Sequence, residues 1–301
     1  MVIDKLIEQI ICKKNPTIVG IDPEWSKLPD YYKNEVSVSD AVERWAVDVI
    51  DAVLDIVPAV KPQMAFFEVF GHDGVRVHQN VVRYAHSKGL FVVDDSKRND
   101  IGNTARAYAF AHLAKDGPIN ADFLTVSPFL GTDSIQPFID IAVRDGKGLF
   151  ILVKTSNPSS VEISEATNSR GEMVRDWLAG YIREKGEEVI GTHGYSSIGA
   201  VVGATFPEEA KKLRETMKNS FFLVPGYGTQ GGSADGVVSC FNDDGLGAII
   251  NSSRGVLYQY LTSADYDGSR AMYMEIVRNQ ALLMKKAVYG ALKRVHTKMQ
   301  Y

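Results

Sequence analysis

Hydrophobic and polar positions follow a repeated unit along the chain: a short apolar run, a polar or glycine-containing stop, and a helix-like stretch. Most of the apolar runs are nearly continuous, which is typical of parallel strands that are covered by helices. Eight runs predict strands: Thr17–Ile21, Ala59–Gln63, Phe91–Asp95, Phe123–Val126, Leu149–Lys154, Ile198–Val202, Phe221–Val224 and Ala248–Asn251. Eight alternations of strand and helix in one chain favour an α/β fold of the (β/α)8 TIM-barrel type over an open sheet.

The segments between the runs carry the spacing of amphipathic helices. Val38–Val57 and Gly74–Lys88, for example, place apolar residues three and four positions apart. A further short amphipathic helix is predicted over Met1–Asn15, ahead of the first strand. Because no low-complexity linker divides the sequence, we expect residues 1–301 to form a single domain.

Two intervals depart from the regular unit. The interval from Ser156 to Ser197 is longer than one crossover needs and holds two charged helical stretches. It predicts an insertion after strand five, about residues 157–197, on the face where barrels carry their active sites. The last segment, Ser269–Tyr301, predicts a long helix with a basic tip that packs back on the barrel.

Composition narrows the class of protein. The chain is 45% hydrophobic and 23% charged, as soluble globular proteins are, and its net charge of −4 provides no basic surface for nucleic acid. No apolar run approaches the roughly 18–20 residues of a membrane span, and charges interrupt the first helix too often for a signal peptide. With two cysteines, Cys12 and Cys240, no disulfide framework is indicated, so we expect a cytoplasmic protein.

Charged residues follow the third predicted strand, at the rim where barrel enzymes carry catalytic groups. Asp95 and Lys97 are two positions apart on an extended segment and should share a face, whereas Asp94 and Ser96 should point the other way. Lys61, one strand over, is expected at the same barrel mouth. The alternative is a solvated charged turn, which the buried strand directly before it disfavours. A Lys–Asp–Lys arrangement keeps its charges by mutual pairing and can polarise an anionic substrate.

A second group of residues suits phosphate. A glycine-rich segment, residues 224–232, follows strand seven, and Arg254 follows strand eight. Glycines let the backbone approach an anion closely, Arg254 can grip phosphate oxygens with two donors, and Gln230 can add another. Glycine-rich loops alone are mostly plain turns, but loops after strands seven and eight form phosphate sites in this fold. The pairing therefore predicts phosphate binding.

Other rim residues have two readings each. Asp22 suits a ribose hydroxyl, although Asp-Pro also starts ordinary turns. Thr155 and Ser156 suit the polar edge of a base, although both residue types also cap helices. The six histidines form no HxxxH pair and the cysteines no CxxC pair, so no metal site is predicted.

Together these motifs resemble a known family. Asp95-x-Lys97-x-x-Asp100-Ile101, followed by Thr104, is similar to the signature of orotidine 5′-phosphate decarboxylases. Further matching blocks stand in the expected order: Gly20-Ile-Asp22-Pro, Lys61-Pro-Gln63-Met-Ala-Phe-Phe, Lys154-Thr-Ser156-Asn-Pro, Pro225-Gly-Tyr-Gly-Thr-Gln230-Gly-Gly and Ser253-Arg254-Gly. The combined spacing of these blocks is more specific than any single motif. The sequences of the blocks resemble those of the longer branch of the family.

The resemblance implies roles for the matching residues. Lys97 would donate a proton to C6 of the pyrimidine, Asp95 would lie against the substrate carboxylate, and Lys61 would hold the charge network and a ribose hydroxyl. The other implied contacts are Asp22 and Gln63 with ribose, Ser156 with the base edge, and Gln230 and Arg254 with phosphate, with Pro225 and Ser253 also in the substrate site. The family uses no metal or organic cofactor.

The resemblance also implies a partner chain. Asp100, Ile101 and Thr104 would enter the active site of a neighbouring subunit, which makes a homodimer with shared sites the expected assembly. The implied ligands are orotidine 5′-monophosphate and its product UMP.

Two rival functions are open to test from the sequence. One is a metal-dependent sister activity on the same scaffold, a sugar-phosphate synthase or keto-acid phosphate decarboxylase. Those enzymes are expected to carry a glutamate at the rim of strand two, where this chain has Lys61 and Gln63. The other is a catalytically silent nucleotide-binding relative, which the complete set of charged residues disfavours.

Overall fold

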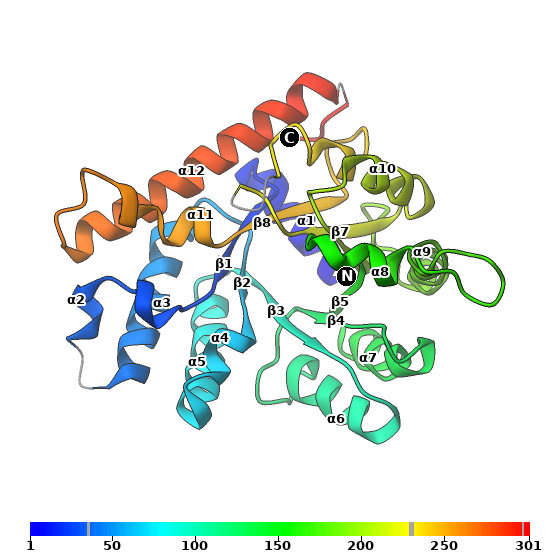
Figure 1. Ribbon diagram of the computed structural model, residues 1–301, viewed down its shortest axis with the longest axis horizontal. Coiled ribbons are helices and arrows are strands. Elements are labelled where there is room, and N and C mark those ends of the chain that lie inside the picture. Colours follow the sequence, from blue (N-terminus) through cyan, green and yellow to red (C-terminus); the bar gives the residue numbers. More distant parts are fainter. Residues whose placement is uncertain (35–36, 229–231, 297) are drawn as a thin grey trace.

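Eight parallel strands close into a barrel in chain order, with β1 paired to both β2 and β8 (Figure 1). This computed structural model describes residues 1–34, 37–228, 232–296 and 298–301. The strands are β1 Thr17–Ile21, β2 Ala59–Pro62, β3 Phe91–Arg98, β4 Phe123–Val126, β5 Gly148–Lys154, β6 Ser196–Val202, β7 Ser220–Val224 and β8 Ala248–Ser252. The predicted (β/α)8 barrel is confirmed.

Helices form the outer layer of the barrel and lie around it in Figure 1. Their bounds are α1 Val2–Lys13, α2 Asp30–Lys33, α3 Val38–Val53, α4 Met64–Glu68, α5 Gly71–Ser87, α6 Gly102–Leu113, α7 Thr132–Asp145, α8 Val161–Ser164, α9 Val174–Gly186, α10 Pro207–Thr216, α11 Arg254–Leu257 and α12 Arg270–Val295. None of the helices in these described ranges is long and apolar enough to cross a membrane.

The strands are buried on both faces, which explains their nearly continuous apolar sequences. Inward side chains such as Ile18 and Phe150 pack inside the barrel with the apolar face of α1, including Ile3 and Ile7. Outward side chains such as Val19 belong to the larger core between strands and helices. Helix α1 therefore fills one end of the barrel and leaves the mouth at the carboxyl ends of the strands for the site.

The long β5–β6 interval is simpler than predicted. Helix α9 packs against β5 and β6 and so serves as the ordinary crossover helix. The added part is the stretch before it, residues 157–173, which contains the short helix α8. The charged helical pattern of α9 belongs to a regular barrel helix, exposed on one side and buried on the other.

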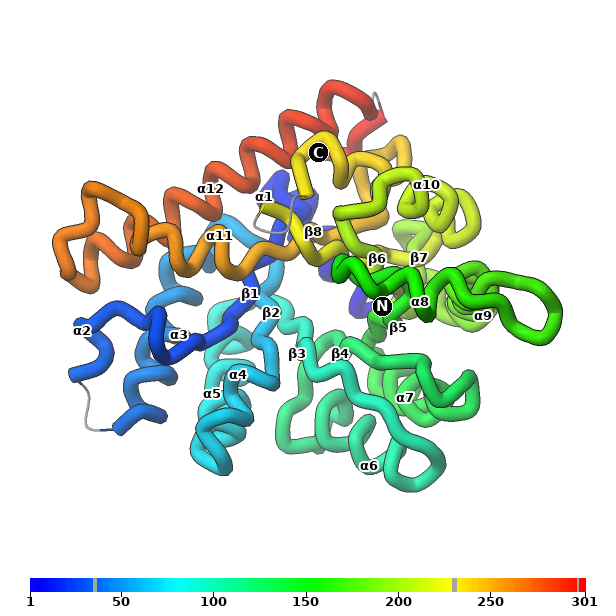
Figure 2. The backbone as a smooth tube through the Cα atoms, in the orientation of Figure 1, coloured from blue at the N-terminus to red at the C-terminus, as the bar shows by residue number. Residues whose placement is uncertain are grey.

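The chain ends on the outside of the barrel. Helix α12 packs against α3, α11 and β1, so the last part of the sequence lies beside the first strand (Figure 2). Its N-cap Ser269 accepts a hydrogen bond from the Met272 amide, which fixes where the helix begins.

Candidate active site

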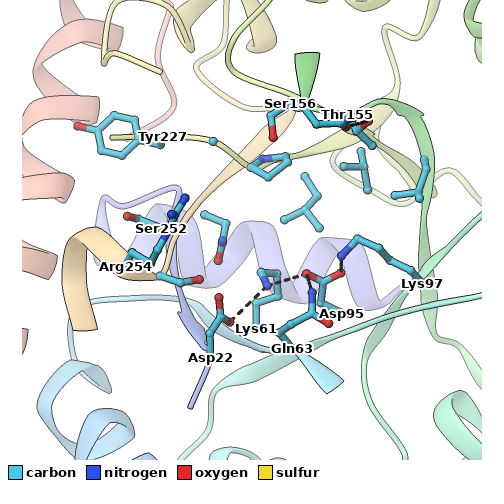
Figure 3. Close-up of a pocket in the computed structure, with 18 of the residues that line it drawn as sticks. Asp22, Lys61, Gln63, Asp95, Lys97, Thr155, Ser156, Tyr227, Ser252 and Arg254 are labelled. Carbon is cyan, nitrogen blue, oxygen red and sulfur yellow. Dashed lines mark hydrogen bonds and ion pairs between the residues drawn. The ribbon is translucent and has the colours of Figure 1, made fainter. Parts of the chain in front are cut away.

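A pocket of about 450 Å³ opens at the carboxyl ends of the strands (Figure 3). Most of the residues that the sequence predicted for the site line it: Asp22, Lys61, Gln63, Asp95, Lys97, Ser156, Pro225, Ser253 and Arg254. Gln230 lies outside the described residues. Asp100, Ile101 and Thr104 do not line this pocket.

Four charged side chains form an alternating row across the floor of the pocket. Lys61 Nζ lies 2.7 Å from Asp95 Oδ2 and 3.9 Å from Asp22 Oδ1. Lys97 Nζ donates to Asp95 Oδ1 at 2.5 Å, as the dashed lines in Figure 3 show. Lys61 is 4% exposed and Asp95 is 6% exposed, so these charges interact with little screening by water.

The row keeps its charges because each sign faces the other. Burial by itself would raise the pKa of Asp95, but Lys61 and Lys97 lower that pKa to about 2. Burial by itself would lower the pKa of Lys61, but Asp95 and Asp22 raise it above its ordinary value. At neutral pH the pocket therefore presents a carboxylate held between two ammonium groups.

Asp95 and Lys97 share the pocket as predicted, but the backbone between them is not a regular strand. Lys97 has a positive φ of 46°, and the register between β3 and β4 shifts between Asp94 and Arg98. Thr125 on β4 stabilises this bend: its Oγ1 accepts from the Lys97 amide at 3.0 Å and donates to Asp95 Oδ1 at 2.9 Å. Sequence reasoning missed Thr125, although it is the one polar residue in its strand.

Gln63, which was expected to contact a ribose, makes hydrogen bonds within the protein in this structure. Its Nε2 donates to Asp95 Oδ2 at 2.9 Å, so in this structure it completes the hydrogen bonding of the buried carboxylate. Its Oε1 faces the start of α4 and accepts from the Ala65 amide at 3.4 Å. Contact between Gln63 and a ribose stays a prediction.

Two buried acceptors point to a ligand with hydroxyl or amide donors. Asp22 Oδ1 and Asn251 Oδ1 are both buried without a hydrogen-bond partner, and both residues line the pocket. Buried polar atoms without partners are costly in a folded protein, so such atoms at a pocket are typical of a binding site. Asn251 was not assigned a role from the sequence, although it begins the segment that leads to Arg254.

The opposite wall is built around a close approach of β1 to the end of β8. A Cβ on Gly20 would lie 1.9 Å from Ser253 Oγ and 3.2 Å from Asn251 Oδ1. Glycine at position 20 therefore leaves the room in which Asn251 of β8 and Ser253, just after β8, reach the mouth. Arg254, the first residue of α11, lines the same wall, and its guanidinium lies across the pocket from Lys97 in Figure 3.

Comparison with known proteins identifies the family. The sequence profile described as "Orotidine 5'-phosphate decarboxylase / HUMPS family" matches residues 16–264. The chain belongs to this family. An orotidine 5'-phosphate decarboxylase of Rhodopirellula baltica is 42% identical over 289 residues, which cover 91% of this chain and 94% of the relative. The relative of the same name from Clostridium novyi is 37% identical over 287 residues, which cover 95% and 98%.

A solved structure supports the same assignment. The structure of Leishmania donovani OMP decarboxylase superposes with a TM-score of 0.74 at 28% identity, covering 97% of this chain and 99% of the neighbour. The family therefore accounts for the barrel fold.

The segment after Lys97, residues 100–104, does not line the pocket of its own barrel. Asp100 Oδ1 accepts from the Ile101 amide at 2.8 Å, and Ile101 is 57% exposed at the start of α6.

The carboxylate of Asp95, which could otherwise bind a metal ion, is paired with two lysines of the same pocket. Among the described residues, no group of three or more His, Cys, Asp and Glu side chains is arranged to hold a metal ion. Asp95, the deepest carboxylate of the pocket, is already engaged by Lys61 and Lys97.

Proposed function

We propose that this chain decarboxylates orotidine 5′-monophosphate to UMP and CO2, the last step of de novo UMP synthesis, without a metal or organic cofactor. The observation that carries the proposal is the row Asp22–Lys61–Asp95–Lys97 at one side of a pocket that has Arg254 at the other. A nucleotide that carries a carboxylate at one end and a phosphate at the other is complementary to this arrangement.

Lys97 supplies the chemistry at C6. When the bond between C6 and the carboxylate breaks, its electron pair stays on C6, which the ring stabilises poorly. The Lys97 ammonium stabilises that developing charge and then transfers a proton to C6. The Lys97 side chain is 43% exposed, so solvent can return a proton to the amine after product release.

Asp95 contributes in two separable ways. It holds the Lys97 ammonium at 2.5 Å, and it would face the substrate carboxylate. Two carboxylates ~4 Å apart repel by roughly 4 kcal/mol at an effective dielectric of about 20, and this repulsion disappears as CO2 leaves. Ground-state repulsion of this kind is disputed as a source of catalysis, so the positioning of Lys97 is the contribution that the geometry supports directly.

The phosphate end supplies binding energy. Arg254 can bind phosphate oxygens with two parallel hydrogen bonds, and Gln230 is proposed to add a third donor. Binding energy realised far from the reacting carbon can order the site and orient the base against Lys97. Asp22 and Asn251 would accept hydrogen bonds from the ribose that joins the two ends.

We propose a homodimer in which each pocket is completed by the partner. Asp100, Ile101 and Thr104 stand at the rim of the barrel without lining its own pocket, and they would enter the pocket of the second copy. Two other exposed apolar residues, Phe129 at 72% and Leu130 at 47%, follow the neighbouring strand β4 and suit the same interface.

Subunit mixing tests the shared site. Lys97→Ala and Asp100→Ala subunits, each inactive alone, should regain partial activity when mixed, because some hybrid sites contain both native residues. If subunit exchange is demonstrated by mass spectrometry and activity stays absent, Asp100 serves its own chain.

The activity itself is tested by a direct assay. Purified protein treated with EDTA should consume orotidine monophosphate. The loss of absorbance of orotidine monophosphate measures this reaction. Lys97→Ala should lose turnover and still bind UMP. Lys88→Ala is the matched control, because Lys88 is similarly exposed and pairs with Asp51 on the outside of the barrel. Undiminished decarboxylation by Lys97→Ala would overturn the proposed mechanism.

The same assay separates the rival functions. Activity that disappears with EDTA and returns with magnesium would favour the metal-dependent sister reaction of this family. UMP binding without any turnover by the wild-type chain would favour a silent nucleotide-binding relative.

We also propose a cytoplasmic location. Cys12 is exposed and Cys240 is buried, and neither forms a disulfide. Cell fractionation that recovers the protein from an oxidising compartment would contradict this location.

A further inference from the structure

Opposite the catalytic row, the outward face of β3 carries a second ionic group. This outer cluster consists of Asp94, His112, Arg98 and His78. Asp94 is fully buried between β3 and the helices α5 and α6, which supply His78 and His112. It alternates with Asp95, so two neighbouring carboxylates of one strand face opposite sides of the barrel wall.

The contacts of the cluster are short and directional. His112 Nδ1 donates to Asp94 Oδ2 at 2.6 Å, and Arg98 Nε donates to His112 Nε2 at 3.2 Å. Because Nε2 accepts a hydrogen bond, the ring proton of His112 is on Nδ1. Ser96 Oγ donates to Asp94 Oδ1, and His78 Nε2 lies 3.3 Å from that same oxygen.

Arg98 links this cluster to three other elements. Its guanidinium donates to Glu68 Oε1 of α4 at 2.6 Å and lies 5.4 Å from the centre of the Tyr108 ring of α6. Its carbonyl accepts from the Ser127 amide after β4 at 3.0 Å. Arg98 is therefore fixed from both its side chain and its backbone.

The cluster brackets the catalytic lysine. Ser96 and Arg98, the two neighbours of Lys97, both belong to it or donate into it, while Lys97 itself has φ +46°. A non-glycine residue in this conformation is strained and persists only where the surroundings hold it. The regular β3–β4 ladder is interrupted here by a register shift, so the bend is held by Thr125 on the inner side and by the outer cluster on the other.

We propose that Asp94, His112 and Arg98 are positioning residues that clamp the bend of β3 from outside the barrel and so aim Lys97 at the reacting carbon. The proposal rests on the proposed decarboxylase function for its kinetic consequence. The clamp also holds the last turn of α6 against β3 through His112.

The clamp is built to stay ionised. Burial by itself would raise the pKa of Asp94, but the charge of His78 and the hydrogen bond with His112 hold that pKa below its ordinary value. Asp94 accepts hydrogen bonds from Ser96 of β3 and His112 of α6, and His78 Nε2 of α5 lies 3.3 Å away. Arg98 acts one step further out, on His112 Nε2.

The test compares three variants in the full chain. His112→Leu removes both hydrogen bonds, whereas His112→Gln can still donate to Asp94 and accept from Arg98. Leu113→Ala is the control for plain destabilisation, because Leu113 is buried on the same helix and belongs to the apolar core. Each variant is assayed for kcat, for KM, for UMP affinity and for melting temperature.

We expect His112→Leu to lower kcat by about 10- to 100-fold, since a misplacement of ~1 Å at a reacting group can cost about 10²-fold. KM and UMP affinity should change by no more than about twofold, because Arg254 lies on the other wall of the pocket. His112→Gln should recover most of the lost kcat. Leu113→Ala should melt earlier than the wild type and keep the kcat of its folded fraction.

A second readout does not depend on activity. The Lys97 amide donates to Thr125 Oγ1, so hydrogen exchange of that amide should be faster in His112→Leu and near wild type in His112→Gln. If the wild-type chain were inactive on orotidine monophosphate, this readout would still test the clamp while the proposed function failed.

Three results would overturn the clamp. They are an unchanged kcat of folded His112→Leu, equal losses in His112→Leu and His112→Gln, and unchanged exchange of the Lys97 amide. If His112→Leu does not fold, Arg98→Gln and Arg98→Lys provide the same comparison from the more exposed end of the cluster, and unchanged kcat in Arg98→Gln then counts against the proposal.

Discussion

Replacing Asp95 with asparagine should destabilise the protein at neutral pH, although Asp95 lies in a catalytic site where charges often oppose stability. At an effective dielectric of about 20, each contact of Asp95 with an ammonium group near 2.6 Å is worth about 6 kcal/mol of attraction. Burial of the carboxylate offsets most of that attraction. The net effect is given by the pKa, which falls to about 2 in the folded protein.

The pKa of an aspartate in the unfolded chain is about 3.9, so the shift corresponds to about 2–3 kcal/mol of folding free energy at pH 7. Because the folded pKa is the lower one, this stability is fully present above pH ~4 and is lost as the pH falls through ~2. Asparagine is uncharged like the protonated acid, and its single carbonyl oxygen can accept from Gln63 or from Thr125 but not from both, because the two donate to different oxygens of Asp95. Asp95→Asn should therefore be at least about 2–3 kcal/mol less stable at pH 7.

Urea unfolding of both proteins, followed by tryptophan fluorescence at pH 7, 5, 4 and 3, measures this difference. Other carboxylates titrate in both proteins, so the difference between the two curves isolates Asp95. The gap should narrow only below pH ~4. A variant that is as stable as the wild type at pH 7, or a gap that does not narrow in acid, would refute the balance of burial against cation pairing worked out here.

Three further substitutions should change ligand binding or stability by amounts that follow from the structure. Arg254→Ala should weaken UMP binding about 10- to 100-fold in calorimetry, the loss expected for charge-assisted hydrogen bonds to phosphate; unchanged affinity would place the phosphate elsewhere. Arg270→Ala should lower the free energy of unfolding by about 2 kcal/mol, because it leaves the buried Asp48 without its two 2.6 Å contacts. Gly199→Ala should cost about 3 kcal/mol in urea unfolding, because its Cβ would lie 2.3 Å from the Phe221 carbonyl oxygen; wild-type stability would contradict the tight β6–β7 packing.

The strand pattern was predictable because parallel strands buried on both faces leave a strong local signal in the sequence. Thr17–Ile21 and Phe123–Val126 match β1 and β4 at both ends. β3 was predicted to end at Asp95 but continues to Arg98, since hydrophobicity marks only the part of a strand that lies in the core. The last residues of β3 are held by ionic partners such as Lys61 and Glu68, which come from other segments of the chain.

The pocket residues were predictable for a different reason. The carboxyl ends of the strands meet at one rim, so Lys61, Asp95 and Arg254 could be placed together without coordinates. Thr125 was missed, because a single polar residue inside an apolar strand has no local pattern. Asn251, beside Ser252 at the end of β8, was given no role, because an ordinary polar strand end looks the same in the sequence. Their importance depends on which atoms face them across the barrel, and this is a tertiary property.

The run Asp94-Asp95-Ser96-Lys97-Arg98 shows what a linear reading of charge leaves out. The apolar residues before it, Val92 and Val93, are both fully buried, one on each face, so burial alone does not decide which aspartate faces inward. Pairing decides it: Asp95 meets two ammonium groups inside the barrel, and Asp94 meets two imidazoles outside. A slip by one residue would turn Lys97 away from Asp95 and break both sets of contacts. The two ionic groups therefore fix the register of β3 together, and the same contacts that specify the fold at this strand hold Lys97 at the mouth of the pocket.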